Sequence, residues 1–420
     1  WGGPLLILLL GIHIYFTIRT GFVQRKIKKA VKYSVKGDAS GGMSAFGTLT
    51  TTLAATLGTG NIIGVSTAVY LGGPGGVFWC WVTGIIGMAT AYAECFLGVR
   101  FRSQNRDGAY QGGPMYVWQN ALHNPSVGKF YGILTLVAAF GVGCTTQSNS
   151  ITQTTSVSFG LNPHIAGFAA AIIAGLVIVG GIRSIGNVCM KLVPFLAVLY
   201  TASCVLLLFI NRQALLPAVR LILTNALSPR AALGGGAASS LILTARYGIA
   251  RGLFTNEAGI GTAAIAAAAS QTTNPAHQAY VSMTAVFWDT VVMCLLSGLV
   301  IVSNMLLHPE SLNGINEAGL TEAAFSYLPL LGNVFLSLCL VAFAITTLIG
   351  WSYLGEQAYR YVTGNKGIFV YKVAYIVMIY VGAVLPLNLV WECTDLINAL
   401  MVIPNVAALF LLQKFLKYDL

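Results

Sequence analysis

Two long apolar segments of this chain are each interrupted midway by a glycine-rich polar turn. The turns read Gly58-Thr59-Gly60-Asn61 and Thr255-Asn256-Glu257-Ala258-Gly259. In lipid, an unpaired backbone amide is costly, so irregular backbone at membrane depth persists only where protein or a polar cavity satisfies it. Interrupted helices in corresponding positions of two halves are typical of the substrate site of a secondary transporter. The sequence therefore predicts a binding site at these two breaks.

The composition indicates membrane spans along the whole chain. Hydrophobic residues make up 56% of the 420 positions, charged residues only 8%, and the mean hydropathy is +0.77. Soluble domains carry about 25% charged residues. The apolar stretches are far longer than the roughly 10-residue alternating strands of an outer-membrane barrel. We therefore expect an all-α polytopic membrane protein.

The apolar stretches predict eleven spans in one transmembrane domain that covers residues 1–420. The expected spans are 4–22, 43–71, 75–100, 129–158, 164–181, 186–210, 237–271, 280–306, 333–360, 367–386 and 390–416. An interfacial stretch is expected at 215–227. Spans two to six and seven to eleven each open with an interrupted segment, so we predict a 5+5 inverted repeat. The predicted parts are an extra first helix with a basic cytosolic loop (1–42), a first repeat (43–211) and a second repeat (237–417).

The placement of the basic residues predicts the topology. A dense cluster follows the first span, and Lys and Arg in the later loops fall mostly on the same side. The cluster comprises Arg25, Lys26, Lys28, Lys29, Lys32 and Lys36. By the positive-inside bias this side is cytosolic, with the N-terminus outside and the C-terminus inside. The net charge of +11 comes without the aromatic or recognition elements of a nucleic-acid binder, so no nucleic-acid partner is expected.

Other classes of site find little support. The eight cysteines and five histidines are dispersed singly, which argues against a metal cluster. No span unites a nucleophile, a base and an orienting group, so we expect no enzyme. The glycines of the first break have the spacing GxGxxxG inside a membrane span, which excludes a dinucleotide fingerprint.

The first break offers binding groups of both signs. The free amides of the half-helix that begins near Asn61 suit a carboxylate, and the carbonyls of Ala54 to Leu57 suit a cation. Gly58 and Gly60 lack the Cβ that would keep a ligand away from the backbone. The alternative is that these glycines only pack helices.

Polar residues in other spans are further candidates. Thr346 and Thr347 could ligate a hard cation, or bond back to their own helix and bend it. Gln147 lies in a polar stretch, residues 143–150, and could contact a zwitterion or join helices. The intramembrane charges are Glu94, Arg246, Arg251, Glu257, Asp289 and Glu356. For Glu257 we expect pairing with Arg251, and contact with a cation is the alternative.

Several motifs together resemble one family of membrane proteins. They are Gly58-Thr59-Gly60-Asn61-Ile62-Ile63-Gly64-Val65, Leu71-Gly72-Gly73-Pro74-Gly75, Gln111-Gly112-Gly113-Pro114-Met115-Tyr116, Gly181-Ile182-Arg183-Ser184-Ile185-Gly186 and Arg251-Gly252-Leu253-Phe254-Thr255-Asn256-Glu257-Ala258-Gly259-Ile260-Gly261. They extend over most of the chain and are similar to those of the alanine or glycine:cation symporters, a branch of the amino acid-polyamine-organocation superfamily. That resemblance implies eleven helices, ten of them in the leucine-transporter fold.

The resemblance also implies roles for individual residues. The substrate-binding residues would be Thr59, Gly60, Gln147, Phe254, Thr347, Gly350 and Trp351. The co-transported sodium ion would be held by Ala54, Leu57, Phe343, Thr346 and Thr347. Some relatives carry an acidic residue shortly before the first break, where this chain has Thr50, Thr51 and Thr52, so an acidic contact to the substrate amine is not expected.

We therefore expect a sodium-coupled symporter in a bacterial-type inner membrane that imports alanine or glycine by alternating access. The alternatives are proton coupling through Glu257 or Asp289 and, from another class, a channel or receptor with the same fold. A channel requires a continuous polar pore, and no span shows a full polar stripe. The sequence does not decide between alanine and glycine or give the oligomeric state.

Overall fold

The computed structural model describes residues 3–35, 44–105, 108–227, 241–312, 317, 319–329, 332–385 and 387–416. These residues are almost entirely helical, with one short β-hairpin. Positions 36–43, 237–240 and 417, which the sequence placed at the edges of the two repeats, lie outside the described residues, as does Lys36 of the basic cluster.

The first half of the chain contains the first interrupted helix. Its elements are α1 (Gly3–Arg19), η1 (Val23–Lys26), α2 (Ile27–Val35), α3 (Ala45–Thr56), η2 (Thr59–Asn61), α4 (Ile63–Gly72), α5 (Gly76–Arg100), β1 (Ser103–Gln104), β2 (Tyr110–Gln111), α6 (Pro114–Asn120), α7 (Pro125–Phe140), η3 (Gly141–Thr145), α8 (Thr146–Phe159), α9 (Pro163–Val179), α10 (Gly181–Ile210) and α11 (Arg212–Leu227). The strands pair antiparallel, with Ser103 opposite Gln111.

The second half contains the second interrupted helix. Its elements are α12 (Leu241–Asn256), α13 (Thr262–Ala268), α14 (Pro275–Val286), η5 (Phe287–Cys294), α15 (Leu295–Leu307), η6 (Pro309–Leu312), α16 (Gly319–Phe325), α17 (Gly332–Thr363), α18 (Ile368–Val384), α19 (Leu387–Leu412) and η7 (Gln413–Phe415). Both η3 and η5 are π-helical turns inside long spans, a feature that is frequent at functional sites.

Three helices begin in the same way, at an Asn-Pro pair. The side chains of Asn124, Asn162 and Asn274 each accept a hydrogen bond from an N–H in the first turn of α7, α9 and α14. The following proline occupies the first helical position, where its missing N–H costs nothing. These local signals explain why the spans start within a few residues of the predicted limits.

The described helices account for the expected spans. Six are long and apolar enough to cross a membrane, and two further pairs would each cross as one bent span. One of these pairs is α1 with η1 and α2, bent by 63°, and the other is α3 with η2 and α4, bent by 62°. The shorter apolar helices α9 and α18 and the interrupted pair α12 and α13 provide the rest.

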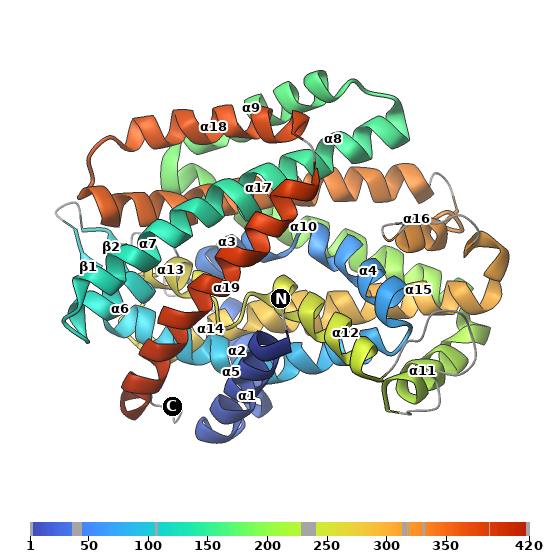
Figure 1. The fold of residues 1–420 in the computed structure, drawn as a ribbon, viewed down its shortest axis with the longest axis horizontal. Coiled ribbons are helices and arrows are strands. Elements are labelled where there is room, and N and C mark those ends of the chain that lie inside the picture. Colours follow the sequence, from blue (N-terminus) through green and yellow to red (C-terminus); the bar gives the residue numbers. More distant parts are fainter. Residues whose placement is uncertain are drawn as a thin grey trace.

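The helices pack into one bundle with a distinct layer along one face (Figure 1). There α9 and α18 lie side by side, with α17 beneath them. The β-hairpin and α6 lie at one end of the bundle, and α11 and α16 lie at the other. Helix α19 crosses the near face and meets α1, where the ring of Phe410 lies 4.9 Å from that of Tyr15 and 5.6 Å from that of Phe16.

Two surface segments differ from simple loops. The basic segment after the first span was expected to be a loop, but it is helical from Val23 to Val35 and packs against α14. Its lysines lie beside aromatic rings, with Lys26 Nζ 5.9 Å from the ring of Tyr280 and Lys29 Nζ 5.6 Å from that of Tyr33. The stretch 215–227 lies within α11, which packs against α15.

An arginine clasp joins the hairpin to the second interrupted helix. Arg102, next to β1, donates to the carbonyls of Ala268, Ser270 and Thr272 at 3.1, 2.5 and 2.8 Å. The ring of Tyr110 lies 3.6 Å from its guanidinium carbon. The cation thus satisfies carbonyls at the C-terminal end of α13, where the helix dipole favours positive charge.

Candidate functional site

The first break is produced by a side chain that diverts a backbone bond. Gly58 N–H donates to Asn61 Oδ1 at 3.1 Å instead of continuing the ladder of α3 to the carbonyl of Ala54. Asn61 is itself held by Asp289, which accepts from Asn61 Nδ2 at 2.7 Å through its carboxylate and at 3.1 Å through its carbonyl. The break therefore leaves helix-end carbonyls on one side and helix-start amides on the other.

Oxygen atoms gather where α17 passes the end of α3. Thr347 Oγ1 lies 3.4 Å from the carbonyl oxygen of Leu57 and 3.0 Å from that of Phe343. Thr346 Oγ1 lies 2.7 Å from the same Phe343 oxygen. Each threonine thus bonds back to its own helix, as one of the two expectations held, and Thr347 also reaches across to the break.

Close backbone approach fixes this crossing. A Cβ at Gly350 would lie 2.7 Å from Ala55 N and 3.0 Å from Ala54 C, so only glycine fits there. A Cβ at Gly58 would lie 2.8 Å from Thr347 Oγ1. Two glycines, one on each helix, therefore bring the oxygens together.

A small cavity lies beside these oxygens. Its volume is about 20 Å³, roughly the space that one water molecule needs. Its lining comprises Ala55, Thr56, Gly58, Thr59, Gly60, Val142, Gln147, Phe254, Thr255, Glu257, Thr347 and Trp351. Ligand pockets usually measure roughly 300–1,000 Å³, so the site is nearly closed in this conformation.

The wall opposite the break is built on the π-helical turn η3. A Cβ at Gly143 would lie 2.2 Å from Cβ of Trp351, so the indole rests directly on the glycine. Gln147 Nε2 donates to the carbonyl of Val142 at 3.3 Å, and its Oε1 is buried without a hydrogen-bond partner. An unpaired buried acceptor beside a cavity is suited to an N–H of a ligand.

The second break is a run of left-handed turns. Glu257, Gly259 and Gly261 have φ of 52°, 94° and 98°, and only the two glycines adopt such values without strain. Thr255 faces the first break, because a Cβ at Gly60 would lie 3.1 Å from its Oγ1. The two breaks thus meet directly.

The structure shows the partners of two charged residues in the membrane spans, Glu257 and Glu356, and corrects the one expected for Glu257. Glu257 does not pair with Arg251 in the described structure; its Oε2 accepts from Thr262 Oγ1 at 2.6 Å. Six positions separate Glu257 from Arg251, so the two do not share a helix face. Glu356 is paired, with Arg360 at 2.7 Å and Lys372 at 3.6 Å.

Three helices anchor the second break through polar side chains. Glu94 Oε1 of α5 accepts from Gly259 N–H at 2.7 Å and from Asn405 Nδ2 of α19 at 2.6 Å. Asn405 Nδ2 also donates to the carbonyl of Gly259 at 2.9 Å, and Tyr131 of α7 donates to that of Ile260 at 2.9 Å. The irregular backbone of the break is therefore satisfied by protein, as burial in a membrane requires.

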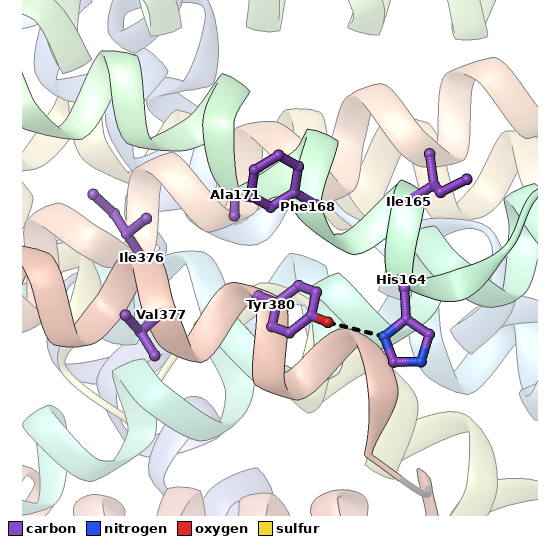
Figure 2. A pocket seen from close by; sticks show the side chains of 7 residues that line it. All are labelled: His164, Ile165, Phe168, Ala171, Ile376, Val377 and Tyr380. Carbon is purple, nitrogen blue, oxygen red and sulfur yellow. Dashed lines mark hydrogen bonds between the residues drawn. The ribbon is translucent and has the colours of Figure 1, made fainter.

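A larger cavity lies elsewhere, between α9 and α18 (Figure 2). It measures about 640 Å³ and is lined by His164, Ile165, Phe168, Ala171, Ile376, Val377 and Tyr380. Its polar contact is a hydrogen bond of 2.9 Å between His164 and Tyr380 near one end. Several of its apolar side chains are exposed, as on any lipid-facing surface, so we place the candidate site at the breaks.

The structure gathers most of the predicted residues at one place. Thr59, Gly60, Gln147, Phe254, Thr347 and Trp351 line the small cavity, whereas Gly350 lies against the backbone of α3. Leu57, Phe343 and Thr346 meet Thr347 behind that lining. Sequence reasoning assigned no role to Val142 or to the side chain of Thr255. The position of Thr255 next to Phe254 in the second motif was the available signal for Thr255.

Two interrupted helices that cross beside a small polar cavity, in an all-helical bundle of membrane spans, define a secondary transporter. The comparison with known proteins narrows this class. The chain belongs to the sodium:alanine symporter family, whose model matches residues 1–420. Sodium is accordingly the ion that is co-transported.

Individual relatives cover nearly the whole chain. The sodium/alanine symporter AgcS of Methanococcus maripaludis is 42% identical over 98% of this chain and 92% of its own length. The probable sodium/glutamine symporter GlnT of Bacillus subtilis is 34% identical over 99% of this chain and 86% of its own length. Among solved structures, that of MhsT in complex with L-phenylalanine matches with a TM-score of 0.62 at 15% identity, over 89% of this chain and 90% of that one. This structural match shows the leucine-transporter-type fold.

Proposed function

We propose that this protein imports a small neutral amino acid, alanine or glycine, together with sodium. The observation that carries the proposal is the nearly closed cavity at the first break, which has backbone amides and an unpaired Gln147 oxygen on its walls and cation-type oxygens directly behind it. The name of AgcS supports alanine, and the name of GlnT points to a larger substrate. The large rings of Phe254 and Trp351 in the cavity wall support the smaller solute.

In this proposal the substrate binds by its zwitterionic end. The first N–H groups of η2, those of Thr59 and Gly60, have no acceptor within that short turn and suit the carboxylate. Gln147 Oε1 accepts from the ammonium group. Phe254 and Trp351 leave room for a hydrogen or a methyl side chain.

Sodium would bind on the other side of Thr347. The carbonyls of Ala54, Leu57 and Phe343 and the hydroxyls of Thr346 and Thr347 supply the oxygen donors that a hard cation prefers. Because Thr347 also lines the cavity, the ion and the substrate share one wall. Sodium that draws α3 and α17 together therefore favours substrate binding, which is the energetic coupling that symport requires.

The setting is a polytopic membrane protein. We propose the bacterial-type inner membrane, with the N-terminus outside and the C-terminus in the cytosol, from the excess of Lys and Arg in the loops on one side. The first repeat (43–211) and the second (237–417) would rock against one another around the site, after the extra helix and basic segment of residues 1–42.

The test is uptake of labelled alanine and glycine into proteoliposomes that hold the purified protein. An inward sodium gradient should give concentrative uptake, and a matched potassium gradient should not. Trp351→Ala should weaken alanine uptake and admit larger neutral amino acids in competition, because it enlarges the cavity. If glutamine competes with alanine as well in the wild type as it does in this variant, the assignment of a small substrate is wrong.

Proton coupling and a channel or receptor are the alternatives that the same assay separates. Glu257 and Asp289 are buried carboxylates for which the described structure gives no ion pair, and their hydrogen-bond donors are neutral. Uptake that follows an acid-outside gradient without sodium would replace sodium by the proton. Substrate movement that never exceeds equilibration would indicate a channel.

A further inference from the structure

Glu94 is a buried carboxyl group with one oxygen fully engaged and one without a partner. The residue is 2% exposed. Its Oε1 receives the Gly259 N–H and the Asn405 amide, whereas Oε2 has no hydrogen-bond partner. Glu94 and Asn405 line a very small cavity of about 10 Å³ between α5, α6 and α19, which is separate from the proposed substrate cavity.

The charge of this carboxyl is not balanced by a neighbour. The ion pairs of the described residues involve neither Glu94 nor Glu257. Both carboxyl groups lie at the turn after α12, because Glu94 of α5 accepts the N–H of Gly259 and Glu257 lies two positions before that glycine. An isolated ionised carboxylate in an apolar interior is far more costly than a neutral carboxyl group, and a second carboxylate nearby adds repulsion.

The lining of the cavity indicates which ligand could remove that cost. Apart from Glu94 and Asn405, the cavity is lined by Leu97, Pro114, Val117, Ala408 and Leu409. A metal cation requires several oxygen ligands, commonly about six. A proton requires only the one free oxygen, Oε2.

We propose that Glu94 is a proton-binding site that locks the second break. With a proton on Oε2 the group is neutral, and Oε1 keeps both hydrogen bonds that hold Gly259 to α5 and α19. Loss of the proton leaves a bare charge beside Glu257, which favours conformations in which the break moves away and water reaches Glu94. The site adds a proton to the sodium and amino acid of the proposed function, and its existence does not depend on that function.

Other titratable groups around Glu94 are few. Glu257 approaches from the turn after α12, Tyr131 from α7, and His13 from α1, where its Nδ1 bonds to Thr90 at 2.8 Å. Cys95 follows on α5 itself. The residues that face Glu94 from α6 and α19, Pro114 and Asn405, do not titrate. Glu257 and His13 are therefore the groups from which the test must separate Glu94.

The first experiment measures the melting temperature of the purified protein from about pH 5.5 to about pH 9, without substrate. The melting temperature of the wild type should fall as the pH rises. The folded protein keeps the proton on Glu94 whereas the unfolded chain loses it, so a higher pH favours the unfolded chain. Glu94→Gln mimics the protonated group. Its melting temperature should fall by about 2–4 °C less than that of the wild type over the same pH range. Glu356→Gln is the matched control: it removes a buried carboxylate that is already paired with Arg360 and Lys372, and it should keep the wild-type slope.

Two outcomes would overturn the proposal. One is a Glu94→Gln profile parallel to that of wild type. The other is a profile that Glu257→Gln or His13→Gln flattens while Glu94→Gln does not. Because no transport is measured, failure of alanine uptake has no bearing on the result.

A second measurement on wild type covers the case in which Glu94→Gln fails to fold. A protonated carboxyl group in apolar surroundings adds its O–H across a C=N bond of dicyclohexylcarbodiimide. No group leaves, and the adduct is located by mass spectrometry of peptides. Glu94 should be labelled more at about pH 6 than at about pH 8.5, where less of the carboxyl is protonated, and the paired Glu356 should remain unlabelled. Labelling of Glu257 with Glu94 unmodified at both pH values would refute the assignment.

Discussion

The two breaks meet at one place but are built in opposite ways. At the first, a diverted N–H of Gly58 leaves backbone groups free, and these border the cavity and the threonines of α17. At the second, side chains from three other helices satisfy the turn, so that Gly259 and Ile260 are bonded to protein. The first break has its free groups available to ligands, whereas the second has them already occupied.

This difference shows how the two halves of an inverted repeat can have interrupted helices in corresponding positions that serve different purposes. Related topology places a break at the midplane in each half, but it does not determine what satisfies the freed backbone. Here the first break is suited to exchange ligands during a transport cycle. The second is suited to exchange protein contacts when the bundle changes shape.

The largest expected effect comes from filling the first break. Gly58→Ala should abolish sodium-driven uptake, because the new methyl group would lie 2.8 Å from Thr347 Oγ1 between the proposed ion and substrate positions. Gly64→Ala, in the same interrupted helix, is the control, since its new methyl group would lie 3.9 Å from Thr255 Oγ1, an ordinary contact. If both variants transport normally, the glycines only pack helices.

A smaller effect should separate the two threonines of α17. Thr347→Val should raise the sodium concentration for half-maximal uptake by about 10-fold or more, because the loss of a buried polar ligand costs ~1–3 kcal/mol. Thr346→Val keeps the bridge to Leu57 and should raise it less. Sodium titrations of alanine uptake decide the point, and equal effects of the two substitutions would argue against a special role of Thr347.

A third comparison removes, at each break, the asparagine side chain that holds the backbone in place. Asn61→Ala should weaken sodium dependence, since it frees Gly58 and removes the bond to Asp289. Asn405→Ala should instead lower stability by ~1–3 kcal/mol, because it leaves Glu94 and Gly259 with fewer partners in the interior. Paired melting curves and sodium titrations measure both. The contrast between the breaks fails if each variant changes the same quantity to the same extent.

Sequence reasoning reached much of the fold and of the first break for a physical reason. Interrupted apolar segments and adjacent threonines are local patterns, and local backbone chemistry determines what they form. The span limits and the two threonines of α17 follow from such patterns, whereas Phe343 came only from the family resemblance. The order of the two breaks in the chain likewise sufficed to predict the repeat.

The rest depends on partners that no local pattern reveals. Asn61 and Asp289 are 228 positions apart, and Glu94 and Asn405 are 311 apart. Packing of whole helices decides which of many polar residues meet, and neighbours in sequence can mislead. The expected pair of Glu257 and Arg251 was wrong for this reason, because Thr262 lies on the side to which Glu257 turns. The contact of Trp351 with Gly143 was equally hidden.

The clasp of Arg102 has a consequence for how the molecule can move. Its three bonds to the chain after the second break form or break together, because one planar guanidinium makes them all. A change of shape that lifts the hairpin must also release the chain that follows the second break. We therefore expect the hairpin and the end of the second interrupted helix to move as one body.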